Sequence, residues 1–116
     1  MNILAILNDP PYGTERSYSG LRLALSLGKE PDVELRVFLM ADAVSCAQRG
    51  QKTAEGFYNI ERMLAGLRAK KVPIGTCGTC MDARGMGDEA LTEGAHRSSM
   101  AELTAWTLWA DKVVSF

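Results

Sequence analysis

The chain opens with Ile3-Leu4-Ala5-Ile6-Leu7, an uninterrupted apolar run that Asn8-Asp9-Pro10-Pro11 ends. A run of this length without polar residues is typical of a strand that is buried on both faces, as in a parallel sheet. Residues 8–14 are rich in turn formers. Thr14 can cap a helix, and apolar residues then recur at helical spacing up to Gly28. Residues 1–28 therefore predict a strand, a loop and a helix.

The same order repeats in the middle of the chain. Residues 33–40 predict a second strand, and residues 41–53 predict a short helix and a loop. An amphipathic helix follows, with an apolar face formed by Phe57, Ile60, Met63, Leu64 and Leu67. Residues 73–76 predict a short third strand with Cys77 at its carboxyl end. The segment 81–87 is then expected to turn into a small helix.

The last third of the chain completes the alternation. A weak pattern at residues 90–97 indicates a fourth strand. The sequence Ser99-Met100-Ala101-Glu102 is a capping box, and it opens a helix that is apolar almost all round, as expected of a helix buried or lying at a subunit contact. Residues 112–116 predict the last strand. Alternating strands and helices predict an α/β fold: a mostly parallel sheet with right-handed crossovers and helices on both faces.

Composition narrows the function classes. The 116 residues suit one domain, 1–116, and 47% of them are hydrophobic, as in ordinary globular proteins. Thirteen basic and 14 acidic residues give a net charge of −1, which leaves no basic excess for nucleic acid or an anionic membrane. No apolar run reaches the ~20 residues of a membrane span, and no signal peptide is evident. With only three cysteines, we expect a cytoplasmic protein with reduced thiols and no disulfide scaffold.

The most informative segment for chemistry is residues 75–85, GTCGTCMDARG. It holds Cys77 and Cys80 as a C-x-x-C pair, and Gly75 and Gly78 let the backbone come close to a ligand. A helix amino end or the guanidinium of Arg84 can lower a thiol pKa from about 8.5 into the range ~3.5–7.5. The segment therefore indicates nucleophilic sulfur chemistry.

Four interpretations of this cysteine pair compete. A structural zinc site needs four ligands, and only Cys46 and His96 remain, neither at a zinc-knuckle spacing. A thioredoxin-like dithiol normally follows the first strand and faces a later cis-proline, whereas all four prolines precede Cys77. One cysteine could instead carry sulfur as a persulfide. Both could also be small buried residues, which is common for cysteine.

Three separate motifs resemble the DsrE/DsrF-like family, and within it the YchN-like branch, which is related to the TusD sulfur-relay proteins. The segment Pro11-Tyr12-Gly13-Thr14 is similar to the family's P-x-Y-G-T segment. Residues 77–85 match the branch pattern C-G-x-C-x-x-A-R-G, with Cys77 at the offset of the persulfide-carrying cysteine of TusD-like members. Residues 98–103 and 110–116 resemble the family's last helix and strand. The resemblance covers essentially the whole chain.

The resemblance implies a three-layer α/β/α sandwich with a parallel sheet of about five strands. It also implies homotrimers, homohexamers built as dimers of trimers, or hetero-oligomers with DsrF- and DsrH-like partners. We expect sulfur-donor and sulfur-acceptor proteins as partners, and no cofactor. We therefore expect a sulfur carrier or sulfurtransferase that uses a cysteine persulfide in intracellular sulfur relay. Cys77 would attack the outer sulfur of a donor persulfide, and Cys80 would receive that sulfur or release it as hydrosulfide.

A second hypothesis is a non-catalytic module that binds a small anion or a nucleotide, or an assembly subunit. Ligands of open parallel sheets bind beyond the carboxyl ends of the strands. Two loops reach that edge, 8–14 and 77–85, and they would face each other across one crevice if their strands were neighbours. Tyr12, Gly13, Gly78 and Arg84 would then contact the ligand, although no complete phosphate-binding fingerprint is present.

The remaining candidate residues are assigned structural roles. Asp82 is expected to point outward or to pair with Arg84, and Arg84 itself could form a surface ion pair with Asp82 or Asp88. His96 is expected in an exposed loop, and Cys46 is interpreted as a packing residue. The two tryptophans, Trp106 and Trp109, are expected in the core or at an interface.

Overall fold

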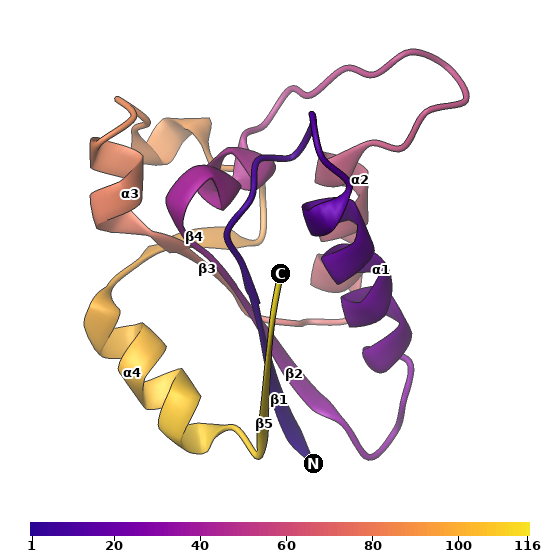
Figure 1. Ribbon diagram of the computed structural model, residues 1–116, viewed down its shortest axis with the longest axis vertical. Helices are drawn as coiled ribbons and strands as arrows, with labels where there is room; N and C mark the ends of the chain where they lie inside the picture. Colours follow the sequence, from indigo (N-terminus) through magenta and orange to yellow (C-terminus); the bar gives the residue numbers. More distant parts are fainter.

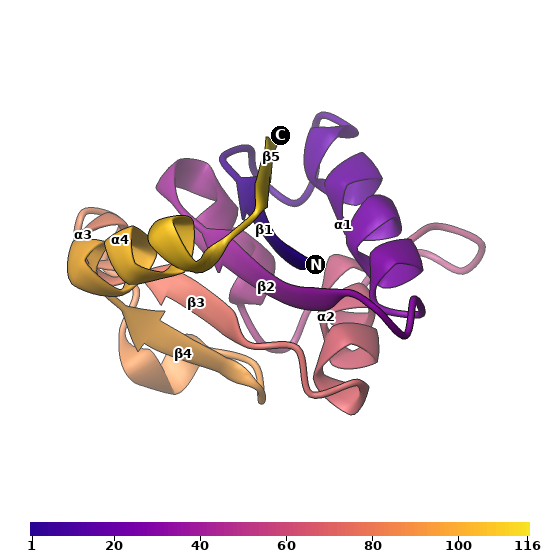
Figure 2. The same ribbon diagram turned by 90° about the horizontal axis from the view of Figure 1, so that it is seen from below.

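The computed structural model describes residues 1–116 and contains a five-stranded sheet in the order β4-β3-β2-β1-β5, with every neighbouring pair parallel. Figure 2 shows the strands in this order. Their bounds are β1 Asn2–Leu7, β2 Glu34–Leu39, β3 Ile74–Cys77, β4 Ala95–Ser98 and β5 Lys112–Ser115. The predicted α/β class is therefore confirmed, and the sheet is parallel throughout.

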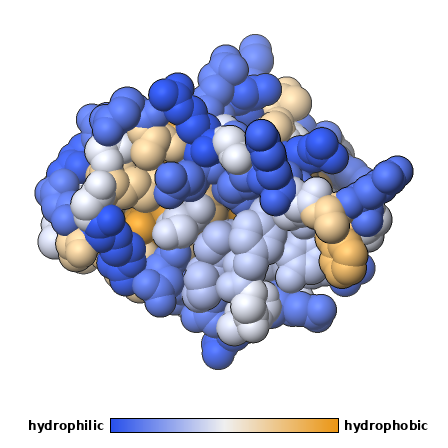
Figure 3. All heavy atoms as spheres, turned by 90° about the horizontal axis from the view of Figure 1, so that it is seen from above, coloured by the Kyte–Doolittle hydropathy of each residue, from blue (hydrophilic) through white to orange (hydrophobic).

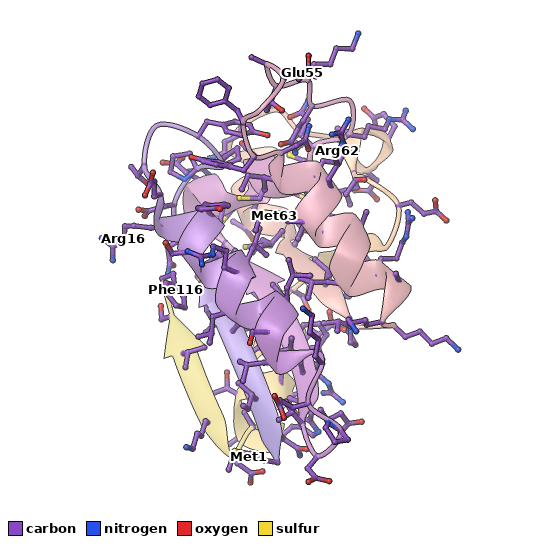
Figure 4. All side chains as sticks on the ribbon, turned by 90° about the vertical axis from the view of Figure 1, so that its right-hand side faces the viewer. Met1, Arg16, Glu55, Arg62, Met63 and Phe116 are labelled. Carbon is purple, nitrogen blue, oxygen red and sulfur yellow. The ribbon has the colours of Figure 1, made fainter.

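Helices cover both faces of the sheet, which gives three layers (Figure 1). The α-helices are α1 Arg16–Leu27, α2 Ile60–Ala69, α3 Gly78–Asp82 and α4 Met100–Trp109, and the 3-10 helices are η1 Ala41–Ala47 and η2 Asp88–Ala90. Figure 4 shows α1 and α2 side by side over one face, with Met63 between them. The opposite face carries α4, with α3 at the carboxyl edge of the sheet. None of the helices has the length and apolar character that crossing a bilayer requires.

The alternation of side chains along the strands produces two cores. The larger core, 16 buried residues, lies between the sheet and α1 and α2 and includes Leu7 and Leu39. The smaller core, eight buried residues, lies on the α4 side of the sheet. It consists of Leu4, Phe38, Val44, Cys77, Met81, Met86, Leu103 and Trp106. The first cysteine of the C-x-x-C pair therefore faces α4, and not the main core.

The structure differs from the local predictions at three helix ends. The residue before α1 is Glu15, whose side chain makes no cap, while Thr14 lies one residue further out and its Oγ1 accepts a hydrogen bond from the Arg16 N–H at 3.4 Å. Phe57 lies outside α2 and is 74% exposed, because Asn59 begins that helix by accepting a hydrogen bond from the Arg62 N–H at 3.1 Å. The small helix after Cys77 begins at Gly78 and not near Met81, so it contains Cys80.

The strand order also corrects the expected crevice. β2 lies between β1 and β3, so the loop after β1 and the turn after β3 are not neighbours. The segment that follows β2, η1, stands between them and contacts α2, α3 and β3. The two loops at the carboxyl edge therefore belong to separate regions of the surface.

Phe38 supports the smaller core from β2, because its ring is 1% exposed and meets the Trp106 ring edge-on, with centroids 6.1 Å apart. Replacing it with alanine (Phe38→Ala) removes a buried ring and should lower the free energy of unfolding by about 3–5 kcal/mol in urea denaturation. The same change at exposed Phe57 is the matched control and should cost less than about 0.5 kcal/mol. Equal losses in the two variants would contradict this packing.

Candidate functional site

Cys77 is the last residue of β3 and the residue immediately before α3, so the C-x-x-C pair occupies the first turn of this helix. The three-residue spacing places both thiols on the same side of the turn. Cys77 is 7% exposed and packs within the smaller core, whereas Cys80 is partly exposed at its margin. All three cysteines are free thiols. The pair thus offers an inner and an outer thiol next to each other.

The outer thiol receives a backbone hydrogen bond from the first residue of η1. Ala41 donates its N–H to the Sγ of Cys80 at 3.2 Å. Ala41 has a φ of +52°, a left-handed conformation that alanine rarely adopts and that costs of order 1 kcal/mol. The strained residue lies where the chain leaves β2 for η1, and it directs an amide at a sulfur atom. This donor is well suited to a sulfur anion, because backbone N–H groups stabilise negative charge.

The electrostatic environment of Cys80 is mixed. Burial raises the pKa of this thiol above its ordinary value, and the interaction with Cys77 raises it further. The Ala41 amide and the Arg84 charge act in the opposite direction. Two thiols in contact resist simultaneous ionisation, so the pair is expected to hold one negative charge more readily than two.

Arg84 fastens α3 to η1. Its Nη1 donates to the Cys80 carbonyl oxygen at 3.1 Å, and its Nε and Nη2 donate to Asp42 Oδ1 at 3.1 and 2.7 Å. The expected ion pair of Arg84 with Asp82 or Asp88 is therefore wrong. The partner of Arg84 is Asp42, which lies 42 residues earlier in the chain. The guanidinium orients the cysteine turn and contributes charge near Cys80, but it makes no hydrogen bond to either thiol.

Arg97 is the residue at this site that the sequence analysis missed. Its Nη2 donates to Asp82 Oδ2 at 2.7 Å, and its Nη1 lies 3.6 Å from Asp88 Oδ1. A Cβ on Gly78 would lie 3.0 Å from Arg97 Nε and 2.9 Å from the Ser98 carbonyl oxygen. Gly78 is therefore required by the close approach of α3 to the end of β4. The sequence contained no local signal for this contact, because Gly78 and Arg97 belong to separate segments that the pairing of β3 with β4 brings together.

The predicted residues Tyr12 and Gly13 lie away from the cysteine pair. The Tyr12 hydroxyl accepts a hydrogen bond from the Ile60 N–H at 3.2 Å and donates to Gln51 Oε1 at 2.6 Å. A pocket of about 320 Å³ lies beside it, lined by Tyr12, Thr53, Ala54, Phe57 and Tyr58. Gly13 has a φ of +99° and no atom within 4 Å of where a Cβ would be. The structure brings Cys77, Gly78, Cys80 and Arg84 together and leaves these two residues apart.

The surface around the cysteine pair at the carboxyl edge carries no pocket. Viewed from above, this side of the molecule is mostly hydrophilic, and hydrophobic atoms show between the hydrophilic ones on the α3 side (Figure 3). None of the three pockets of the structure is lined by Cys77 or Cys80. No group of three or more His, Cys, Asp or Glu side chains comes together to hold a metal ion.

Cys46 differs from the other two cysteines because it lies in the larger core. It is fully buried, and burial raises its pKa to about 11, with a hydrogen bond to Ser17 acting in the opposite direction. This confirms the interpretation of Cys46 as a packing residue. His96, by contrast, lies on β4 and not in an exposed loop, and its Nε2 contacts Glu102 Oε1.

The raised pKa of Cys46 predicts a pH-dependent loss of stability. The folded thiol keeps its proton up to about pH 11, whereas the unfolded thiol loses it near pH 9. The contribution of this thiol to the free energy of unfolding is therefore fully present below pH 9 and is lost as the pH rises towards 11. Between about pH 8 and pH 10.5, the wild type should lose about 2 kcal/mol more unfolding free energy than Cys46→Ala in urea titrations. Parallel losses in both proteins would show that this thiol ionises freely when folded.

Comparison with known proteins places this geometry in a family. The model of the DsrE/DsrF-like family matches residues 1–116. Protein YchN of Escherichia coli K12 is 46% identical over 115 residues, which are 98% of this chain and 97% of that protein. The uncharacterized protein MJ0989 of Methanocaldococcus jannaschii is 35% identical over 116 residues and is covered completely, as is this chain.

Solved structures agree with the sequence comparison. The crystal structure of the E. coli YchN protein superposes with a TM-score of 0.93 at 46% identity, covering 99% of this chain and 98% of that one. A protein of Bacteroides thetaiotaomicron, 16% identical, has a TM-score of 0.72 over 98% of this chain and 94% of its own, and shows the same fold. The chain therefore belongs to the DsrE/DsrF-like family, which is linked to sulfur relay.

Proposed function

We propose that this protein is a sulfur carrier in which Cys77 holds a persulfide. The observation that carries the proposal is the contact between an inner thiol, Cys77, and a partly exposed thiol, Cys80, in one helical turn at the carboxyl edge of the sheet. The Ala41 amide supplies a donor for a sulfur anion at this place. Reduced thiols are required, so we also propose that the protein works in the cytoplasm.

The transfer needs no external oxidant. The Cys77 thiolate attacks the outer sulfur of a donor persulfide, R–S–SH, and the donor S–S bond breaks. The leaving thiolate takes up the proton that Cys77 lost, which gives R–SH and a Cys77 persulfide. Only one sulfur atom has to reach Cys77, which suits a thiol that is 7% exposed.

The sulfur bound to Cys77 can leave by two routes, and Cys80 takes part in the second. An acceptor thiol on a partner protein can attack the outer sulfur of the Cys77 persulfide and regenerate the Cys77 thiol. Alternatively, Cys80 attacks the Cys77 Sγ, which forms a Cys77–Cys80 disulfide and releases hydrosulfide. The second route leaves an oxidised pair that a dithiol reductant must reduce before another cycle.

Intact-mass measurement after incubation with a persulfide donor tests the proposal. The wild type should gain one sulfur atom that cyanide removes, and Cys77→Ser should gain none, because the attacking thiolate is gone. Cys80→Ser should keep the added sulfur longer, since it cannot form the disulfide. Cys46→Ser is the matched control and should load like the wild type. Equal loading of Cys77→Ser and the wild type would assign the sulfur to another residue.

We also propose that the chain forms a homo-oligomer, a trimer or hexamer, through the outer face of α4. Met100 and Leu108 on this face are 62% and 83% exposed, and Val113 on the edge strand β5 is 45% exposed. The hydroxyls of Thr104 and Thr107 bond to carbonyl oxygens within α4, at 2.9 and 2.7 Å, so this face offers few free polar groups. Met100 and Leu108 lie together with Leu103, Thr104 and Thr107 around one shallow pocket, and an exposed apolar surface of this kind is typical of an interface.

Light scattering coupled to size-exclusion chromatography tests the assembly. The change Leu108→Glu places a charge in the proposed interface and should convert the oligomer into monomer, because an unpaired buried charge costs several kcal/mol. Phe57→Glu introduces the same charge at an exposed apolar residue outside α4 and should leave the assembly intact. An unchanged oligomer in Leu108→Glu would locate the interface elsewhere.

A further inference from the structure

A pocket lined mainly by aromatic side chains lies beside the loop that follows β1, away from the cysteine pair. Its volume is about 320 Å³, and its lining residues are Tyr12, Thr53, Ala54, Phe57 and Tyr58. This volume is at the lower end of the range for ligand pockets, about 300–1,000 Å³. None of the lining side chains carries a charge. The pocket therefore suits one small, uncharged molecule.

The pocket lies at the place in the sheet where ligands of parallel α/β folds bind. The chain proceeds from β1 through β2 and β3 to β4 in one direction, and it then returns to β5 on the other side of β1. The strand order therefore reverses at β1. Ligands of open parallel sheets bind beyond the carboxyl ends of the strands at such a reversal. Tyr12 is in the loop that leaves the carboxyl end of β1, and this loop reaches the pocket through Tyr12.

Tyr12 is held in place by the protein itself. Its hydroxyl accepts a hydrogen bond from the Ile60 N–H at 3.2 Å and donates to Gln51 Oε1 at 2.6 Å, which leaves the ring for apolar contacts. The Tyr12 and Tyr58 rings are nearly parallel, with an interplanar angle of 20° and centroids 6.2 Å apart. Tyr18 stacks on Tyr58 in turn, with centroids 4.1 Å apart. Aromatic rings prefer offset-stacked partners, so these parallel rings favour a planar ring as ligand.

Three of the lining residues come from an arch, residues 52–57, that projects from the molecule and carries Glu55 at its outer end (Figure 4). The base of the arch is fixed, because Glu61 accepts hydrogen bonds from the N–H groups of Gly50 and Gln51 at 3.0 and 2.9 Å. The Phe57 ring lines the pocket and is nevertheless 74% exposed. A ring bound in the pocket would cover part of this apolar surface, which favours binding.

We propose that this pocket binds a small, uncharged ligand with a planar aromatic ring. The ligand ring contacts Tyr12 and Tyr58 on the body of the protein and Phe57 on the arch. The Tyr12 ring and the base of the arch are already fixed, so little of the site has to be ordered on binding. The proposal is independent of sulfur transfer, because neither Cys77 nor Cys80 lines the pocket.

Titration with 2-naphthol and decahydro-2-naphthol, followed by ligand-observed NMR at pH 7, tests the proposal. The two probes are uncharged at this pH and share one carbon skeleton, but only 2-naphthol is planar and aromatic. We expect 2-naphthol to bind the wild type saturably. Decahydro-2-naphthol should bind about fivefold more weakly or worse, because it cannot stack on the aromatic rings.

Protein resonances and variants locate the bound probe. The ring current of 2-naphthol should shift the methyl signals of Thr53 and Ala54 more than methyl signals outside the pocket. Phe57→Ala should weaken binding about fivefold, and Ala54→Trp should abolish binding by filling the pocket. Both positions are exposed, so the variants should stay folded. The matched control is Leu23→Ala, which removes an exposed apolar side chain of α1 outside the pocket and should bind like the wild type.

Three outcomes would overturn the proposal. Neither probe could bind the wild type saturably, which would show that the pocket holds no small ligand of this class. The two probes could bind equally well, which would show that the pocket does not distinguish a planar aromatic ring from a saturated one. Binding of 2-naphthol could also persist unchanged in Ala54→Trp, which would place the bound probe outside the pocket.

Discussion

The parallel pairing of β3 between β2 and β4 is the constraint on which the site depends. Because the three strands run in the same direction, their carboxyl ends meet at one edge, and Cys77 ends the middle strand. The chain leaving β2 supplies the Ala41 amide on one side, and the end of β4 supplies Ser98 on the other. Neither residue is near the cysteines in sequence. An antiparallel neighbour would have placed an amino end there instead, with different groups around the thiol.

The elements that sequence reasoning predicted well are those with strong local signals. The buried run at residues 3–7 and the alternation at 33–40 became β1 and β2, and the Ser99 cap begins α4 as expected. Phe57 misled the analysis because it continues the helical spacing of α2, yet the helix cannot extend back past its cap at Asn59. The spacing of apolar residues identifies a helix more reliably than it identifies the residue at which the helix begins.

The composition of the candidate site was only partly predictable. The spacing of Cys77 and Cys80 is local, and so is their helical turn, so the pair could be found from sequence. The ion pairs of the site join Arg84 to Asp42 and Arg97 to Asp82, which are 42 and 15 residues apart in the sequence. No periodic pattern in the sequence predicts ion pairs over such separations. The separation of Tyr12 from the cysteines likewise follows from strand order, which depends on the packing of the whole sheet.

Helix α4 links the chemistry of the site with the proposed assembly. Its first turn carries Glu102, which is directed towards β4, while Met100 and Leu108 on the same helix are exposed to solvent. Trp106 fixes α4 on the sheet through its edge-on contacts with Phe38 and His96. A rigid helix transmits a displacement along its length, so a subunit packed against Leu108 would also hold the Glu102 end of α4 in place. If the chain assembles through the outer face of α4 as proposed, the same helix lies both at the subunit contact and, through Leu103 and Trp106, against Cys77 in the smaller core.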